Sequence, residues 1–128
     1  MTTERDPDGA LGEKRARLRR GRSAEFIASV VLMAKGYRIL ARRLRTPYGE
    51  LDIIAVRGRR LAFVEVKRRR SIDEAHDALT GGQAQRIADA AEWWIGRHRR
   101  YRDHEMGLDA ILVVPRRWPQ HLPNVLSD

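Results

Sequence analysis

The sequence predicts an α/β domain whose elements follow the order α-β-β-β-α-β. Two segments, residues 13–35 and 83–98, show the spacing of apolar residues that is typical of a helix. Short apolar runs lie between them at 49–56 and 61–67, and another follows the second helix at 108–114. Because a strand that follows a helical crossover lies parallel to its neighbour, we expect a mixed central sheet flanked by helices.

The first predicted helix, residues 13–35, opens with a basic stretch and then becomes apolar. Its apolar residues follow the i, i+3, i+4 spacing of one helix face: Phe26, Ile27, Val30, Val31 and Ala34. Gly36 stands where a glycine commonly ends a helix. Apolar and basic residues then alternate over 37–43, which predicts a strand with one solvated face, and a turn follows at 46–49.

The two central strands, at 49–56 and 61–67, are joined around a basic turn at 57–60. An arginine run at 68–70 follows the second of them, and then a loop or short helix extends to about Leu79.

The second predicted helix, residues 83–98, carries one apolar stripe: Ile87, Ala90, Ala91, Trp94 and Ile95. The last strand stops at Pro115. We therefore expect a flexible arm at residues 1–12, a single domain at 13–115 and an irregular tail at 116–128.

Composition narrows the class of protein. A chain of 128 residues with 42% hydrophobic residues fits one domain with a real core. It has no cysteine, which excludes disulfides and thiolate metal sites and suits a reducing, cytoplasmic setting. Because no apolar run approaches about 18 residues and the N-terminus does not resemble a signal peptide, we expect a soluble protein without a membrane partner.

The charge of the chain predicts a polyanionic partner. Lysine and arginine together number 26 against 17 acids, for a net charge of +9, and only Lys14, Lys35 and Lys67 are lysines. Arginine contacts phosphate in a bidentate manner, so we expect nucleic acid to bind. A GC-rich genome would explain the preference for arginine over lysine, but not the excess of bases over acids.

Among the charged residues of the two central strands, Asp52, Glu65 and Lys67 can lie on one face. Side chains two apart on a strand share a face, so Glu65 and Lys67 point the same way. A four-residue loop at 57–60 places Asp52 directly across from Glu65. A two-residue loop at 57–58 places it diagonally, on the same face, whereas a plain three-residue loop separates the two acids.

Opposed acids on paired strands repel each other unless a cation lies between them. Mg²⁺, or Mn²⁺, suits such a site, because it takes one or two carboxylates and completes its shell with water and substrate phosphate. We therefore expect Asp52 and Glu65 to bind the metal, with the backbone carbonyl of Val66 as a further ligand. Lys67 would orient the attacking water or stabilise charge on the phosphate. The alternative is an exposed cross-strand charge pattern.

The pattern resembles the PD-(D/E)xK nuclease superfamily and its restriction-endonuclease-like αβββαβ core, in which an acid precedes a strand bearing (D/E)-x-K. More narrowly, the chain resembles the UPF0102 (YraN-type) family, small bacterial proteins akin to Holliday-junction resolvases. The resemblance covers residues 21–114. The motifs that carry it are Gly21-Arg22-Ser23-Ala24-Glu25, Gly36-Tyr37, Gly49-Glu50-Leu51-Asp52 and Phe63-Val64-Glu65-Val66-Lys67-Arg68-Arg69.

The resemblance implies a further acid on the first helix, which corresponds to Glu25; the alternative is an ordinary charged helix residue. The chain departs from the family at Gln83, where a lysine is usual, and at 106–108, where Arg-Phe usually precedes the acid Asp109. For Asp109 and for Glu50, the alternative to a role in the site is a structural role.

Four arginines flank the acids and are expected to hold the phosphate backbone: Arg22, Arg68, Arg69 and Arg70. A solvated arginine run is the alternative. The leading hypothesis is a Mg²⁺- or Mn²⁺-dependent endonuclease that cleaves DNA rather than RNA, with branched DNA as one candidate substrate. A homodimer would suit a two-fold junction. The alternatives are a non-catalytic nucleic-acid-binding module that keeps the fold, and a protein-interaction subunit.

Overall fold

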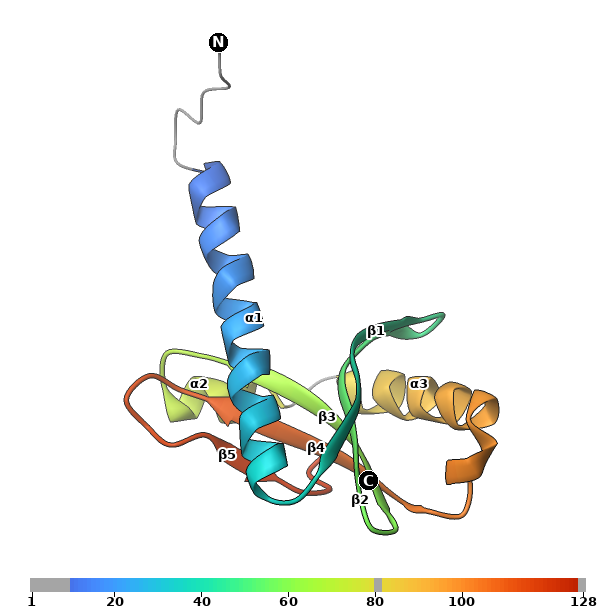
Figure 1. Cartoon of the computed structure of the whole chain (residues 1–128). Coiled ribbons are helices and arrows are strands. Elements are labelled where there is room, and N and C mark those ends of the chain that lie inside the picture. Colours follow the sequence, from blue (N-terminus) through green and yellow to red (C-terminus); the bar gives the residue numbers. More distant parts are fainter. Residues whose placement is uncertain (1–9, 80–81, 127–128) are drawn as a thin grey trace.

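The computed structural model describes residues 10–79 and 82–126 (Figure 1). Most of the predicted arm at 1–12 lies outside these residues, and the first helix begins at Ala10 instead of near residue 13. The elements are α1 (Ala10–Ala34), β1 (Arg38–Thr46), β2 (Gly49–Arg57), β3 (Arg60–Arg68), α2 (Ile72–Asp77), α3 (Gln83–Arg97), the 3₁₀ turn η1 (Arg99–Tyr101), β4 (Glu105–Val113) and β5 (Gln120–Leu122).

The strands form one sheet in the order β1-β2-β3-β4-β5. Among the strands of the described residues, only β3 and β4 are parallel, and α3 lies in the crossover between them, so the predicted mixed sheet and α/β class are confirmed. β4 begins at Glu105, earlier than predicted, because its pairing with β3 starts at Arg60↔Glu105. No helix within residues 10–79 and 82–126 is long and apolar enough to cross a membrane.

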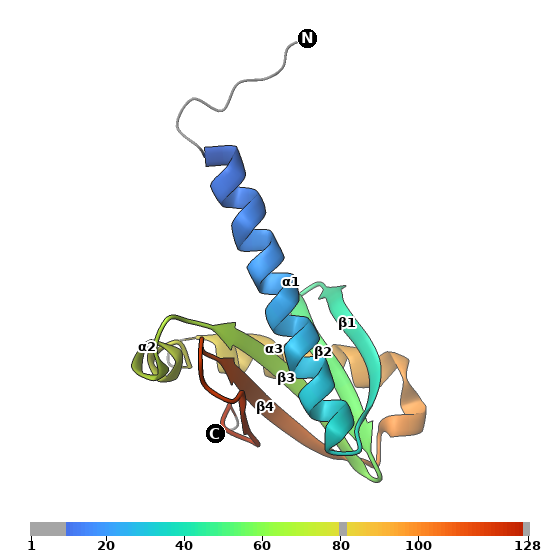
Figure 2. The ribbon, with the colours of Figure 1, turned by 60° about the vertical axis from the view of Figure 1, so that its left-hand side comes forward.

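The two long helices cover opposite faces of the sheet. Figure 2 shows α1 in front of the sheet and α3 behind it. On the α3 side, Phe63 packs against Trp94, and the centroids of the two rings are 5.9 Å apart. On the α1 side, Leu32 and Val64 belong to a second buried cluster. Alternation along β3 therefore sends successive side chains to different helices.

The buried face of α1 differs from the predicted apolar stripe. Ala24, Ala28 and Leu32 face the sheet and are at most 2% exposed, whereas Phe26 is 63% exposed and Val30 is 44% exposed. Small side chains at i and i+4 let the helix approach the sheet closely, so the alanines pack there in place of the bulkier residues. The predicted stripe is therefore wrong for most of its residues, although Val31 does pack against the buried cluster on this side. The N-terminal half of α1 extends beyond the sheet (Figure 1).

The hairpin between β2 and β3 has the register that the predicted site requires. Val56 pairs with Leu61, and the ladder continues to Arg57↔Arg60, so that Gly58 and Arg59 form a two-residue turn. Gly58 has a positive φ of 58°, which a hairpin turn of this length favours. Of the two registers left open by the sequence, the structure has the one that pairs Val56 with Leu61, although the turn itself is two residues long and not four.

The predicted irregular tail contains a strand. β5 pairs antiparallel with β4, and the chain beyond it is held by Asp109, which is fully buried. Both oxygens of Asp109 accept hydrogen bonds from Arg60 at 2.8 Å, and Asn124 N–H donates to Oδ1 at 2.9 Å. His121 Nε2 lies 2.9 Å from Oδ2. A three-residue strand shows no period, which is why its sequence did not reveal it. Asp109 thus has the structural role named as its alternative.

Candidate functional site

The site lies where β2 and β3 stop pairing. Their ladder ends at Ile53↔Val64, and the same register places Asp52 opposite Glu65 one residue further on. There the Val66 N–H donates to Asp52 Oδ2 at 2.8 Å, so a side chain has replaced the backbone acceptor. β3 continues to pair with β4 as far as Arg68, while β2 diverges from it. The two predicted acids therefore meet at an open fork between strands.

Glu65 is paired with two cations. Its side chain is only 9% exposed, and its Oε2 lies 3.1 Å from Lys67 Nζ and 3.6 Å from Arg86 Nη2. The predicted proximity of Glu65 and Lys67 is present, and their shared face is not an exposed one. Arg86 comes from α3 and was not predicted.

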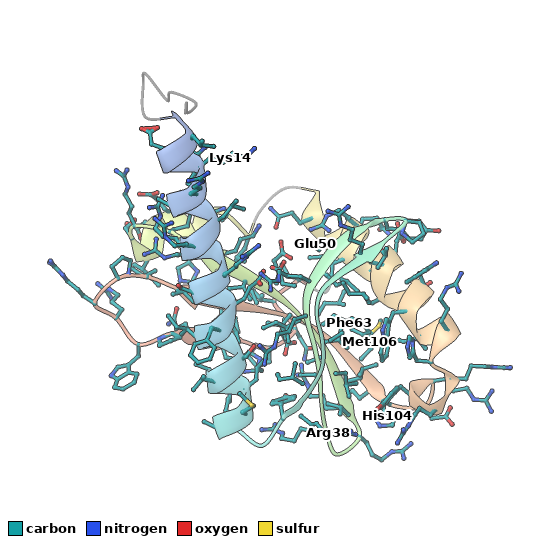
Figure 3. All side chains as sticks on the ribbon, turned by 45° about the horizontal axis from the view of Figure 1, so that its top comes forward. Lys14, Arg38, Glu50, Phe63, His104 and Met106 are labelled. Atoms are coloured by element: carbon teal, nitrogen blue, oxygen red, sulfur yellow. The ribbon has the colours of Figure 1, made fainter. Side chains whose placement is uncertain are left out.

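Arg86 connects α3 to the end of the β1–β2 hairpin. Its Nη1 donates to the Glu50 carbonyl at 3.1 Å, and a Cβ on Gly49 would come within 2.8 Å of the same nitrogen. Figure 3 shows Glu50 at the end of the sheet where α3 begins. The sequence held one signal: Arg86 directly precedes the buried Ile87, at the border of the helix stripe. Glu50 contributes its backbone here, in line with its structural alternative.

Asp52 is held in an electrostatically unfavourable place. Burial, the neighbouring charge of Glu65 and, to a lesser degree, the charge of Glu25 raise the pKa of Asp52 to about 7, against the opposing hydrogen bond from Val66. A carboxyl in such surroundings either keeps its proton or gains a cation. A divalent ion would relieve the repulsion between the two acids.

Glu25 lies near the acids without joining them. It follows the buried Ala24 on α1, and its Oε1 lies 3.3 Å from Arg43 Nε. Burial raises the pKa of Glu25, while Arg43 opposes the change. Among the residues that the structure describes, no three His, Cys, Asp or Glu side chains are grouped closely enough to hold a metal ion. The oxygen donors present, which are two carboxylates and the Val66 carbonyl, fit a hard ion such as Mg²⁺ that keeps several waters.

An open cavity of ≈ 480 Å³ adjoins the fork on its α1 side. Three of the predicted site residues line it: Glu25, Asp52 and Val66. Its wall is strongly basic: Arg17, Arg20, Arg68, Arg69 and Arg70. Glu65 and Lys67 are not among its lining residues.

The predicted arginines after β3 thus share the cavity with the acids. Arg22 does not line it, although its charge acts on Glu25. Sequence reasoning missed Arg17 and Arg20. Their spacing from Ala24, of seven and four residues, was the available signal, because it places them on the helix face that meets the sheet. Gln83, at the family's usual lysine position, donates its Nε2 to the Ala78 carbonyl at 3.0 Å.

Comparison with known proteins confirms the resemblance to the UPF0102 family. The uncharacterised protein family UPF0102 matches residues 24–113. A UPF0102 protein of Rhodopseudomonas palustris (strain BisB18) is 51% identical over 117 residues, which cover 91% of this chain and 87% of that protein. One from Nitrobacter winogradskyi is 57% identical, covering 80% of this chain and 86% of its own length. One from Methylorubrum populi is 48% identical, covering 96% of this chain and 98% of its own length.

Proposed function

The chain belongs to the uncharacterised protein family UPF0102, and from this premise we propose that it is a divalent-metal-dependent endonuclease that cleaves DNA. The observation that carries the proposal is the pair of carboxylates at the β2–β3 fork. Asp52 and Glu65 share one buried site, Lys67 lies 3.1 Å from Glu65, and an arginine-lined cavity adjoins Asp52.

Each of these residues has a role in phosphodiester hydrolysis. Asp52 and Glu65 would hold Mg²⁺ or Mn²⁺, and the Val66 carbonyl would complete the protein ligands. A bound divalent ion supplies a polarised phosphate and a water of lowered pKa. Lys67 would orient the attacking water and stabilise the negative charge that develops on the phosphate. Glu25 lines the same cavity and would support Glu65 or the bound metal.

The arginines of the cavity supply binding of the phosphate backbone. Arg17 and Arg20 on α1 face Arg68, Arg69 and Arg70 across the cavity. Such contacts neutralise phosphates without reading sequence, so affinity should fall steeply as salt rises. We place the activity in the cytoplasm, because a chain without cysteine gains no disulfides from an oxidising compartment.

A second candidate, a non-catalytic nucleic-acid-binding module, is favoured by one observation. Glu65 is already paired with Lys67 and Arg86, so this acid needs no metal to balance its charge. In that case the arginines would bind nucleic acid and the acids would serve the fold.

Cleavage assays on the Glu65→Gln variant separate the two candidates. Wild-type protein, with Mn²⁺ or Mg²⁺, is incubated with duplex, single-stranded and branched DNA. We expect cleavage that EDTA and Glu65→Gln both abolish. Glu92→Gln, which changes an exposed glutamate on α3, is the matched control and should cleave like the wild type.

Equal cleavage by wild type and Glu65→Gln would falsify the endonuclease proposal, because the product would then come from another source. No cleavage of any substrate, together with salt-dependent binding that Arg20→Ala weakens, would establish the binding module instead.

A further inference from the structure

A second groove continues from the candidate site along the N-terminal half of α1. It has a volume of ≈ 670 Å³ and lies between α1 and the loop that joins β4 to β5. Its lining includes five arginines and one tryptophan: Arg19, Arg20, Arg68, Arg116, Arg117 and Trp118. Arg20 and Arg68 also line the cavity beside Asp52. The two hollows therefore meet at these two side chains.

Trp118 is presented to solvent by a fixed loop. It is 92% exposed, whereas Trp94 is 4% exposed and stacks on His98 with ring centroids 3.9 Å apart. The loop is anchored at both ends, because Arg117 N–H donates to the Val114 carbonyl at 3.2 Å and β5 pairs with β4 directly after it. Arg116 has the left-handed backbone, with a φ of 66°, that turns the chain at this point.

An indole ring held out in this way is suited to stacking on another flat ring. Bases stack well on tryptophan, and arginines on either side would neutralise the phosphates that join those bases. Within a duplex each base is already covered by its neighbours, so it offers no free face to the indole. An unpaired base does.

We infer that this groove binds an unpaired strand of DNA, with Trp118 stacked on one of its bases. The inference rests on the proposed function for its substrate class: the scissile phosphate at Asp52 would lie next to a single-stranded segment, as in a flap, an overhang or a branch. None of the described residues that line the groove is acidic, which favours a polyanion over a mixed-charge peptide as its ligand.

The experiment measures binding without metal, so that cleavage plays no part. In EDTA, fluorescence anisotropy reports the binding of a labelled single strand and of a blunt duplex of equal length. We expect Trp118→Ala to weaken single-strand binding about tenfold and to change duplex binding less than twofold. Trp118→Phe should restore most of the loss, because a phenyl ring still stacks.

A strand of abasic sites isolates stacking from charge. It keeps the phosphates but offers no ring, so wild type and Trp118→Ala should bind it equally and more weakly than wild type binds the base-bearing strand. Arg102→Ala, an exposed arginine near the opposite end of the sheet, is the control for general loss of positive charge. Trp118→Ala should keep the wild-type melting temperature, since its side chain packs little in the folded protein.

The inference is overturned if Trp118→Ala binds the single strand as tightly as the wild type, or loses duplex binding to the same extent. Its failure can be told apart from failure of the endonuclease. If Trp118→Ala weakens single-strand binding but no substrate is cut, the inference about the groove is supported and the endonuclease proposal is contradicted. If DNA is cut but Trp118→Ala changes nothing, the reverse holds.

Discussion

The backbone N–H of Val66 donates to Oδ2 of Asp52 across 2.8 Å, one residue past the last pair of the β2–β3 ladder. This contact holds a carboxylate between two diverging strands. It also fixes Asp52 beside Glu65, where burial and the second acid oppose its charge. The fold therefore maintains a carboxylate, that of Asp52, whose charge is unfavourable without a bound metal ion.

Metal binding should stabilise the protein through Asp52. We expect Mn²⁺ to raise the melting temperature of the wild type, by the equivalent of about 2.7 kcal/mol at a concentration one hundred times its Kd. Asp52→Asn keeps the acceptor for Val66 but loses the charge, so it should show no such rise. Asp103→Asn, which changes an exposed carboxylate, should behave as the wild type. An equal rise in all three proteins would exclude Asp52 as a ligand.

The metal-free protein should lose stability as pH rises because of Asp52. Its pKa in the folded state is raised from 3.8 to about 7. Below pH 4 the group is protonated in both states and imposes no penalty, whereas above pH 7 folding must keep a disfavoured charge. Asp52→Asn should therefore be more stable than the wild type at pH 8 in EDTA, by ~2–4 kcal/mol, with a smaller difference at pH 5. Urea unfolding at the two pH values measures this, and a pH-independent difference would contradict it.

Lys67 should affect catalysis more than metal binding. Lys67→Met removes the cation 3.1 Å from Glu65 but leaves both carboxylates. We expect DNA cleavage to fall about 10²–10³-fold, as when one preorganised charge-stabilising group is lost, while the stabilisation by Mn²⁺ persists. Lys35→Met provides a lysine control, because Lys35 contacts His121 instead of the site. Loss of both properties in Lys67→Met would show that the lysine only holds Glu65 in place.

Arg86 should stabilise the junction of α3 with the β1–β2 hairpin. Arg86→Ala removes the hydrogen bond to the Glu50 carbonyl and a longer ion pair to Glu65. We expect the free energy of unfolding to fall by about 1 kcal/mol. Because one cation near the acids is gone, Mn²⁺ should bind more tightly. Calorimetric titration measures the second effect, with Arg99→Ala as an exposed arginine control. Weaker Mn²⁺ binding would mean that Arg86 positions Glu65.

Outside the site, we expect substitution in the buried pair of Arg60 and Asp109 to destabilise the protein more than substitution in any other charge interaction. Burial alone would raise the pKa of Asp109, but hydrogen bonds from Arg60, His121 and Asn124 outweigh it and hold that pKa below its usual range. Its contribution to stability is present above pH 4 and is lost as pH falls. Arg60→Met leaves a buried charge with fewer partners and should cost ~3–5 kcal/mol. Arg59→Ala, at the exposed neighbour, should cost less than about 1 kcal/mol.

Gly107 gives this pair a second test. A Cβ at Gly107 would lie 2.2 Å from Arg60 Nη2 and 2.9 Å from Asp109 Oδ1, so Gly107→Ala should displace the guanidinium. If it acts through Arg60, its destabilisation and that of Arg60→Met will not add in the double variant. Full additivity would place the effect of Gly107 elsewhere.

The sequence alone predicts the order of the elements up to β4, and it predicts that Asp52 and Glu65 meet only if the turn between their strands has an even length. Both follow from local rules: the period of apolar residues gives the element type, and the two-residue period of a strand gives the face. The even-length turn at Gly58 and Arg59 then brings the two acids together.

The packing of the helices on the sheet determines which other residues surround the acids. Arg86, Arg17 and Arg20 reach the site or its cavity only because α3 and α1 pack against the sheet where they do. On α1, spacing marked Phe26 and Val30, yet the alanines face the sheet. Several helix faces can satisfy one apolar pattern, and the closeness of packing selects among them, which is a property of two surfaces and not of one segment.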